Sequence, residues 1–189
     1  MKILTLLTLL ISSPLMATDC TYTIPADGIE LKWTAFKTPE KVGVGGTFAE
    51  LGLNQENYTG KSLAEAISQI KFNIDTSSVR TKNTGRDATI VKWFFQQIPG
   101  GMSFTGNLKD YSDKTLSTAL TVNKISKDIV MSAETKEKIV TAKAKMKLGD
   151  YKLLEALASL NKACFELHKG KTWDDVDLNL NLPYTKTCK

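Results

Sequence analysis

Apolar and polar residues alternate one by one through most of this chain, and no other feature constrains its fold as strongly. In the clearest example Val176, Leu178, Leu180 and Leu182 alternate with aspartates and asparagines. Successive side chains of a strand point to opposite faces, so this period of two predicts a strand with one dry face. The pattern predicts strands within residues 22–24, 29–35, 42–48, 70–76, 102–108, 116–122, 129–133, 140–148 and 176–182.

These eight or nine strands are joined mostly by short polar connections, such as residues 110–114 and 123–127, which is typical of an antiparallel meander. Their shared apolar face has to be covered, either by a second sheet in a sandwich or by closure into a barrel. Residues 87–95 and 153–168 have the apolar spacing of helices instead. We expect one short and one longer helix to flank the sheet, in a single domain over residues 18–189.

The first 17 residues have the pattern of a secretory signal peptide. Lys2 precedes an uninterrupted run in which apolar residues and threonine fill positions 3–11, and the small residue Ala17 marks the expected cleavage site. The run is shorter than the roughly 20 apolar residues of a membrane-spanning helix. We therefore expect an exported product without stable membrane insertion.

An exported chain meets an oxidising compartment, and this one carries three cysteines, Cys20, Cys164 and Cys188. Cys20 and Cys188 stand near the two ends of the mature chain, and we favour a disulfide between them over either pairing with Cys164. Cys164 with His168 as its base is a conceivable catalytic pair. Nothing in the sequence supplies the third, orienting group that such a pair uses.

Composition excludes other classes of function. His168 is the single histidine, so a multi-histidine metal site cannot form. The formal net charge of +5 is spread along the chain, not gathered in a basic tract, and does not indicate nucleic-acid binding. We expect neither an enzyme nor a cofactor or metal protein.

Several segments resemble the YceI-like family of secreted bacterial proteins. They are WTAFKTPEKVGVGGTF at residues 33–48, FNIDTSSVRT at 72–81, the Gly-Arg-Asp at 85–87 with the phenylalanines at 94–95, and residues 105–130. Lys124 occupies the place of the usual turn glycine in this family. The resemblance implies an all-β fold, an eight-stranded antiparallel lipocalin-like barrel. It also implies that the protein is periplasmic or secreted. A further implication is an elongated hydrophobic ligand such as a polyisoprenoid, a quinone or a fatty-acid-like lipid.

A lipid of this kind requires a dry, elongated cavity, and the inward half of each strand would supply its walls. Methionine suits such walls because its side chain adapts to a mobile ligand. The expected ligand-contacting residues are Trp33, Phe48, Phe72, Ile74, Phe94, Phe95, Met102, Phe104, Leu120, Met131 and Met146. The alternative is a non-enzymatic stress-response or interaction protein whose interior is filled core. The oligomeric state is left open, with a homodimer as one option.

Three polar features allow two interpretations each. Arg86 and Asp87 could recognise a ligand head group, although a salt bridge that fixes the lid helix is favoured. Asp174, Asp175 and Asp177 could bind calcium, but a solvated outer strand face is the default. The cluster of glycines between residues 43 and 46 precedes no helix, which argues against a phosphate loop, and we expect a bulge or tight curvature there.

Overall fold

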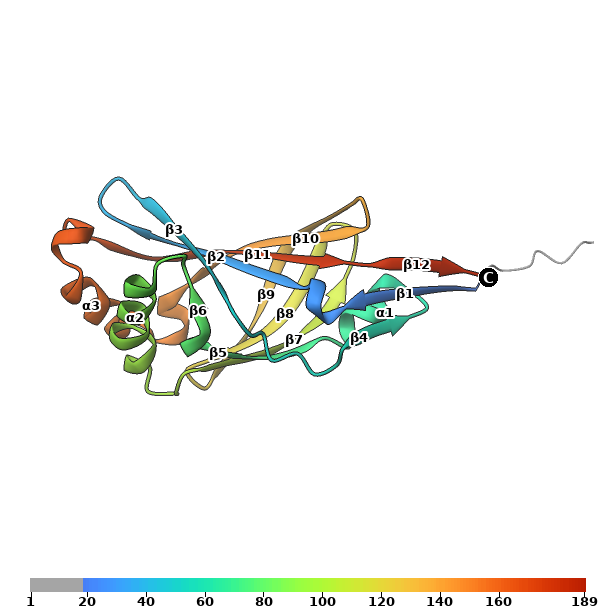
Figure 1. Cartoon of the computed structure of the whole chain (residues 1–189), viewed down its shortest axis with the longest axis horizontal. Coiled ribbons are helices and arrows are strands. Elements are labelled where there is room, and N and C mark those ends of the chain that lie inside the picture. The colour runs from blue at the N-terminus through green and yellow to red at the C-terminus, as the bar shows by residue number, and fades with distance from the viewer. Residues whose placement is uncertain (1–18) are drawn as a thin grey trace, which may run out of the picture.

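The computed structural model describes residues 19–189 and contains one large curled sheet (Figure 1). Its nine strands follow the order β5-β7-β8-β9-β10-β11-β2-β3-β6, and every pair of neighbours is antiparallel. The strands are β2 (Glu30–Lys37), β3 (Val42–Phe48), β5 (Lys71–Asp75), β6 (Val79–Arg80), β7 (Ser103–Tyr111), β8 (Thr115–Val122), β9 (Ile125–Lys136), β10 (Ile139–Lys147) and β11 (Thr172–Pro183).

The sheet forms a half-barrel whose two edges are brought near each other. The edge strands β5 and β6 are joined by only the short helix η2 (Thr76–Ser78). The irregular segment after β3 also runs beside β5, because Asn73 N donates to Leu51 O (3.2 Å) and Asn54 N donates to Lys71 O (3.3 Å). These contacts fold the apolar face inward on itself.

A second, three-stranded sheet extends from one end of the half-barrel. It has the order β12-β1-β4, with β1 (Cys20–Pro25), β4 (Asn57–Gly60) and β12 (Thr185–Cys188). Figure 1 shows β1 and β12 projecting away from the large sheet toward the C-terminus. Cys20 and Cys188 are register partners with Cα atoms 4.0 Å apart and form the predicted disulfide, while Cys164 is a buried free thiol.

The all-β prediction is confirmed, but eight strands was too few. The strands that the alternation missed are β4, β6 and β12, each of two to four residues. Runs this short contain too few residues to establish a period of two. The lengths predicted for the flanking helices also need correction, because α2 (Thr84–Trp93) and α3 (Leu154–Ala163) both have ten residues.

Side-chain caps explain where two of the α-helices begin. The Asn83 side chain accepts from Arg86 N (2.8 Å) and so caps α2. A third helix, α1 (Leu63–Ser68), was not predicted, although side chains cap its start: Glu65 N donates to the Ser62 hydroxyl and Lys61 N donates to Glu65 Oε2. The short helices η1 (Ala26–Gly28), η3 (Phe95–Gln97), η4 (Leu148–Tyr151) and η5 (Glu166–His168) complete the elements.

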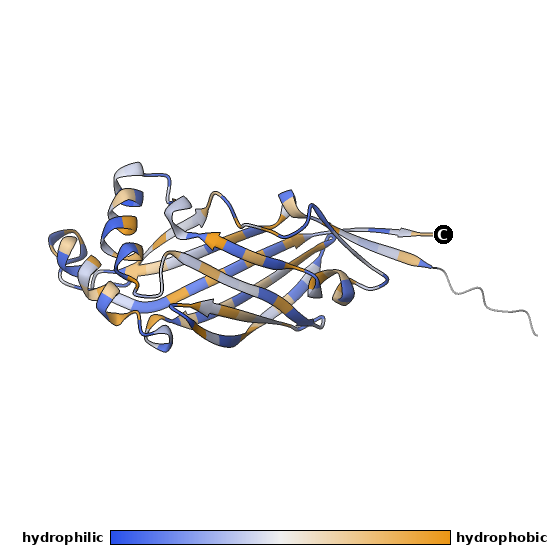
Figure 2. Ribbon diagram, turned by 90° about the horizontal axis from the view of Figure 1, so that it is seen from below, coloured by the Kyte–Doolittle hydropathy of each residue, from blue (hydrophilic) through white to orange (hydrophobic). Residues whose placement is uncertain are grey.

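Two buried clusters occupy the two ends of the molecule. One lies toward β1 and β4 and includes Ile24, Tyr58 and Ile67. The other includes Phe94, Phe95 and Leu153 and packs the large sheet against α2 and α3, which Figure 1 places at the opposite end from the C-terminus. The helices therefore cover one end and the small sheet closes the other. Figure 2 shows how orange and blue positions alternate along the strands between them.

A bulge or tight curvature was expected at the glycines of β3, and a bulge is not found, because β2 and β3 pair without a shift of register. Gly46 instead lies directly under the indole of Trp33, where a Cβ atom would be 2.3 Å from Cζ2. Gly106 likewise lies against the ring of Phe72, whose Cζ would be 2.4 Å from an added Cβ. Absent side chains thus make room for large inward-facing rings.

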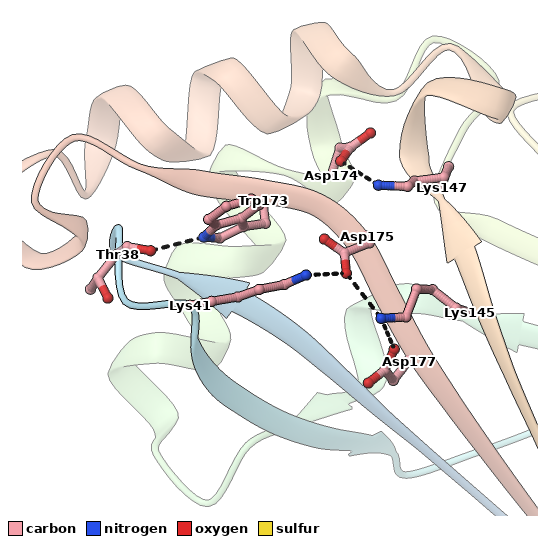
Figure 3. Close-up of polar contacts among 8 residues, drawn as sticks. All are labelled: Thr38, Lys41, Lys145, Lys147, Trp173, Asp174, Asp175 and Asp177. Atoms are coloured by element: carbon pink, nitrogen blue, oxygen red, sulfur yellow. Dashed lines mark hydrogen bonds and ion pairs between the residues drawn. The ribbon is translucent and has the colours of Figure 1, made fainter.

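The acidic cluster on β11 is not simply a solvated face, and this corrects the sequence-based expectation. Asp175 is only 2% exposed, because it accepts from Lys41 Nζ at 2.7 Å and from Lys145 Nζ at 3.4 Å (Figure 3). Lys41 also lies over the rings of Phe36 and Trp173. The contacts attach the turn between β2 and β3 to β11. Hydrogen bonding to Lys41, followed by Lys145, holds the pKa of Asp175 below its usual range.

Within the described residues, no helix has the length and apolar character needed to cross a bilayer.

Replacing both Cys20 and Cys188 by serine should lower the free energy of unfolding by about 2–5 kcal/mol, because the bridge closes a loop of 168 residues. Urea unfolding of the wild type with and without reductant measures the same quantity independently. A Cys164→Ser variant that still responds to reductant is the control. Equal stabilities of the oxidised and reduced wild type would contradict this account of the bridge.

Lys124→Gly should stabilise the protein by about 0.5–1 kcal/mol. Asn123 and Lys124 form the two-residue turn between β8 and β9 with φ angles of 51° and 62°, a left-handed backbone that glycine adopts without steric cost. Thermal unfolding measures the change. Lys127→Gly, at an exposed position inside β9, is the control and should destabilise. Stabilisation by both substitutions, or by neither, would rule out the turn as the cause.

Asp175→Asn should cost about 1–3 kcal/mol at neutral pH, since it removes the charge of a buried carboxylate that accepts a charge-assisted hydrogen bond from Lys41. The lowered pKa means that the stabilisation is complete above the unfolded-state pKa of about 3.9 and is lost as the pH falls through the folded-state pKa. The wild type and the variant should therefore converge in acid. Asp128→Asn, which breaks an exposed pair with Lys109, should change stability by less than about 0.5 kcal/mol. A difference between wild type and Asp175→Asn that is the same at pH 2 and pH 7 would contradict the assignment.

Candidate functional site

The half-barrel encloses a cavity of about 190 Å³. A single water needs only about 10–15 Å³ of cavity volume. The lining comes from both ends of the interior, with Ile29, Leu108 and Leu180 from the cluster near the small sheet and Phe94, Phe95 and Leu153 from the helical end. The cavity therefore connects the two clusters along the inside of the sheet.

Ten of the eleven predicted site residues line this cavity. They come from seven strands, from η3 and from the residue that follows α2, and the strand alternation brings them together from positions more than 100 residues apart in the sequence. These residues are Trp33, Phe48, Phe72, Ile74, Phe94, Phe95, Phe104, Leu120, Met131 and Met146.

Met102 is the exception and does not line the cavity. It precedes the first residue of β7, and its carbonyl oxygen accepts from the amide of Thr76 (2.9 Å) and from the hydroxyl of Thr76 (2.7 Å). Its side chain is half-buried against the cluster at the helical end. The alternating pattern extends one residue beyond the start of β7, and this residue was therefore misplaced.

Other residues that line the cavity were not predicted from the sequence. Leu153, Leu157 and Leu160 face the cavity from the start and one side of α3, so this helix supplies part of the wall. Their spacing in the sequence predicted a helix, but it did not indicate that the helix would line a cavity. Leu51 and Leu53 reach the cavity from the irregular segment beside β5, where no strand was expected.

Aromatic rings gather at the helical end of the cavity. Centroids of Trp33 and Phe48 are 6.4 Å apart, Phe48 and Phe95 6.1 Å, and Phe95 and Phe104 5.8 Å, with Phe94 5.2 Å from Phe95. Such distances are typical of favourable aromatic pairs. The rings form one continuous aromatic surface from β2 and β3 to η3 and β7.

The cavity offers few polar atoms. Thr118 donates to the Met131 sulfur at 3.8 Å, and the Thr172 hydroxyl donates to Asn161 Oδ1 at 2.7 Å. Trp173 Nε1 donates to the carbonyl oxygen of Thr38 at 2.8 Å (Figure 3). Among the described residues, Trp33 Nε1 is buried without any hydrogen-bond partner. An apolar chain would thus meet almost only carbon and sulfur.

Arg86 and Asp87 hold the start of α2 to the end of β6. Asp87 Oδ1 accepts from Thr81 N (2.8 Å) and from the Thr81 hydroxyl, and Arg86 Nη2 donates to Thr81 O (2.6 Å). No ion pair joins the two side chains to each other within the described residues. The expected salt bridge therefore needs correction, because hydrogen bonds to Thr81 hold the start of this helix instead.

Cys164 and His168 are poorly suited to nucleophilic chemistry. Burial raises the pKa of the Cys164 thiol and lowers the pKa of His168, so both groups favour their neutral forms. His168 Nδ1 lies 2.7 Å from the Thr172 hydroxyl. Because that hydroxyl donates to Asn161, the ring nitrogen is the donor here, and this fixes the tautomer. Across residues 19–189, no group of three histidine, cysteine or acidic side chains is arranged to hold a metal ion.

Comparisons with known proteins agree with the fold described above. A family model described as the YceI-like domain matches residues 22–184. No curated protein is similar enough to count as a match. A polyisoprenoid binding domain from Saccharophagus degradans superimposes with a TM-score of 0.60 at 13% identity, covering 89% of this chain and 98% of that one. BcnA from Burkholderia cenocepacia gives 0.56 at 10% identity, with coverages of 86% and 99%.

A YceI protein from Campylobacter jejuni is also similar, with a TM-score of 0.49 at 22% identity and coverages of 78% and 86%. At these identities the first two structures establish a shared fold. The family model covers most of the chain and agrees with that fold. The protein described here therefore belongs to the YceI-like family.

Proposed function

We propose that this protein binds and carries an elongated hydrophobic molecule, of the polyisoprenoid, quinone or fatty-acid-like class, by reversible burial without chemistry. The observation that carries the proposal is the apolar cavity that runs between the two buried clusters. The similar domain from Saccharophagus degradans is described as polyisoprenoid binding, which supports the same class of ligand.

The energetics are adequate for a carrier. Burying one methylene group is worth about 0.8 kcal/mol, so ten methylenes contribute about 8 kcal/mol before the costs of ordering the ligand. Because so few polar lining atoms would have to give up water, desolvation of the walls adds little cost. Affinity would therefore grow with the length of chain that the cavity accepts.

We place this function in the bacterial periplasm. The signal-peptide prediction for residues 1–17 lies outside the described residues. The disulfide between Cys20 and Cys188 favours an oxidising compartment independently. The alternative of a stress-response or interaction protein with a filled interior is disfavoured, because Phe72, Phe104 and Met131 surround open space.

Ala35→Leu tests the proposal directly. Ala35 lines the cavity, so a larger side chain there should occupy the ligand's space and weaken binding at least about tenfold. Binding is measured with a fluorescent prenyl probe and a fluorescent fatty-amide probe. Native mass spectrometry of wild-type protein released from the periplasm by osmotic shock should also show a bound species of several hundred daltons.

Thr34→Leu is the matched control. It adds apolar volume to the same strand on the outer side, where Thr34 borders a groove with Lys32 and Asn179, and it should change probe affinity less than twofold. Thermal unfolding confirms that both variants fold. A wild type that is recovered free of lipid and binds neither probe would refute the carrier function.

A further inference from the structure

The indole of Trp33 combines three properties that are rarely found together. It lines the cavity, it is only 9% exposed, and its Nε1 has no hydrogen-bond partner among the described residues. An indole N–H can only donate, and a buried one normally finds an acceptor. The missing acceptor therefore requires an explanation.

The ring is held where it is. The indole packs on Gly46, where any Cβ atom would overlap Cζ2, Cε2 and Cη2. On another side the ring meets Phe48, with centroids 6.4 Å apart. This packing fixes the position of the N–H before any ligand binds, so the donor is preorganised.

The protein and the solvent are both poor sources of the acceptor. The Thr172 hydroxyl donates to Asn161 and accepts from His168, and Trp173 Nε1 donates to the carbonyl oxygen of Thr38. A buried water needs two to four polar partners. Apart from Trp33, the described lining offers mainly the Thr118 hydroxyl, which already contacts the Met131 sulfur. A molecule that enters the cavity is the remaining source.

We propose that Trp33 Nε1 recognises a neutral acceptor oxygen, of the ketone, ester or ether class, carried by an otherwise apolar chain. This inference rests on the proposed carrier function and specifies the ligand further. A charged group is unsuitable at this position because no lysine, arginine or histidine lines the cavity to compensate a buried anion. Trp33 would therefore distinguish oxygen-bearing chains from plain hydrocarbons of the same length.

The test compares two uncharged ligands of equal chain length, hexadecane and methyl tetradecyl ketone, by displacement of the fluorescent prenyl probe. The quantity of interest is the ratio of their affinities. Trp33→Phe keeps an aromatic ring but removes the donor, and it should lower the preference for the ketone about five- to tenfold relative to wild type. Trp93→Phe, on the exposed side of α2, is the control and should leave the ratio unchanged.

A second measurement does not depend on the variant folding well. In ¹⁵N-labelled wild-type protein, the indole N–H resonance of Trp33 should move downfield when the ketone binds and should not do so with hexadecane. An unchanged affinity ratio in Trp33→Phe, or an indole resonance that responds equally to both ligands, overturns the role of Trp33 alone. Failure of both ligands to bind overturns the carrier function together with it.

Discussion

A curled sheet has to keep one apolar face away from water, and in this protein that face surrounds a space that its own side chains do not fill. The inward residues are large, yet Gly46 and Gly106 leave room for the rings of Trp33 and Phe72. The cavity therefore follows from how volume is distributed over the inner face. Residual voids in an apolar interior reduce stability, and a bound apolar chain would offset that cost.

The two ends of the half-barrel are closed by different means. At one end, α2 and α3 cover the aromatic surface, and Thr81 holds the start of α2 through Arg86 and Asp87. At the other end, the small sheet extends the structure and the disulfide joins its two terminal strands. The covalent bond thus lies far from the helical end (Figure 1). The helical end is held by hydrogen bonds and packing.

Sequence periodicity was sufficient to predict the longer strands and most of the wall, because a half-buried strand orders its side chains by position alone. It could not predict Leu51 and Leu53, which reach the cavity from a segment without regular pairing. It also misjudged Asp175, since the burial of an outward carboxylate depends on Lys41, a residue distant in sequence. Met102 shows the opposite error, in which the pattern continues beyond the strand. Each failure involves tertiary contacts that no local pattern contains.

The central claim is that the interior is hollow and dry, and a crystal of the lipid-stripped protein held under xenon pressure tests it most directly. Xenon enters apolar cavities that exclude water. We expect a xenon peak bordered by Phe72, Phe104 and Met131. A map without xenon, in which these three side chains contact one another, would contradict the claim.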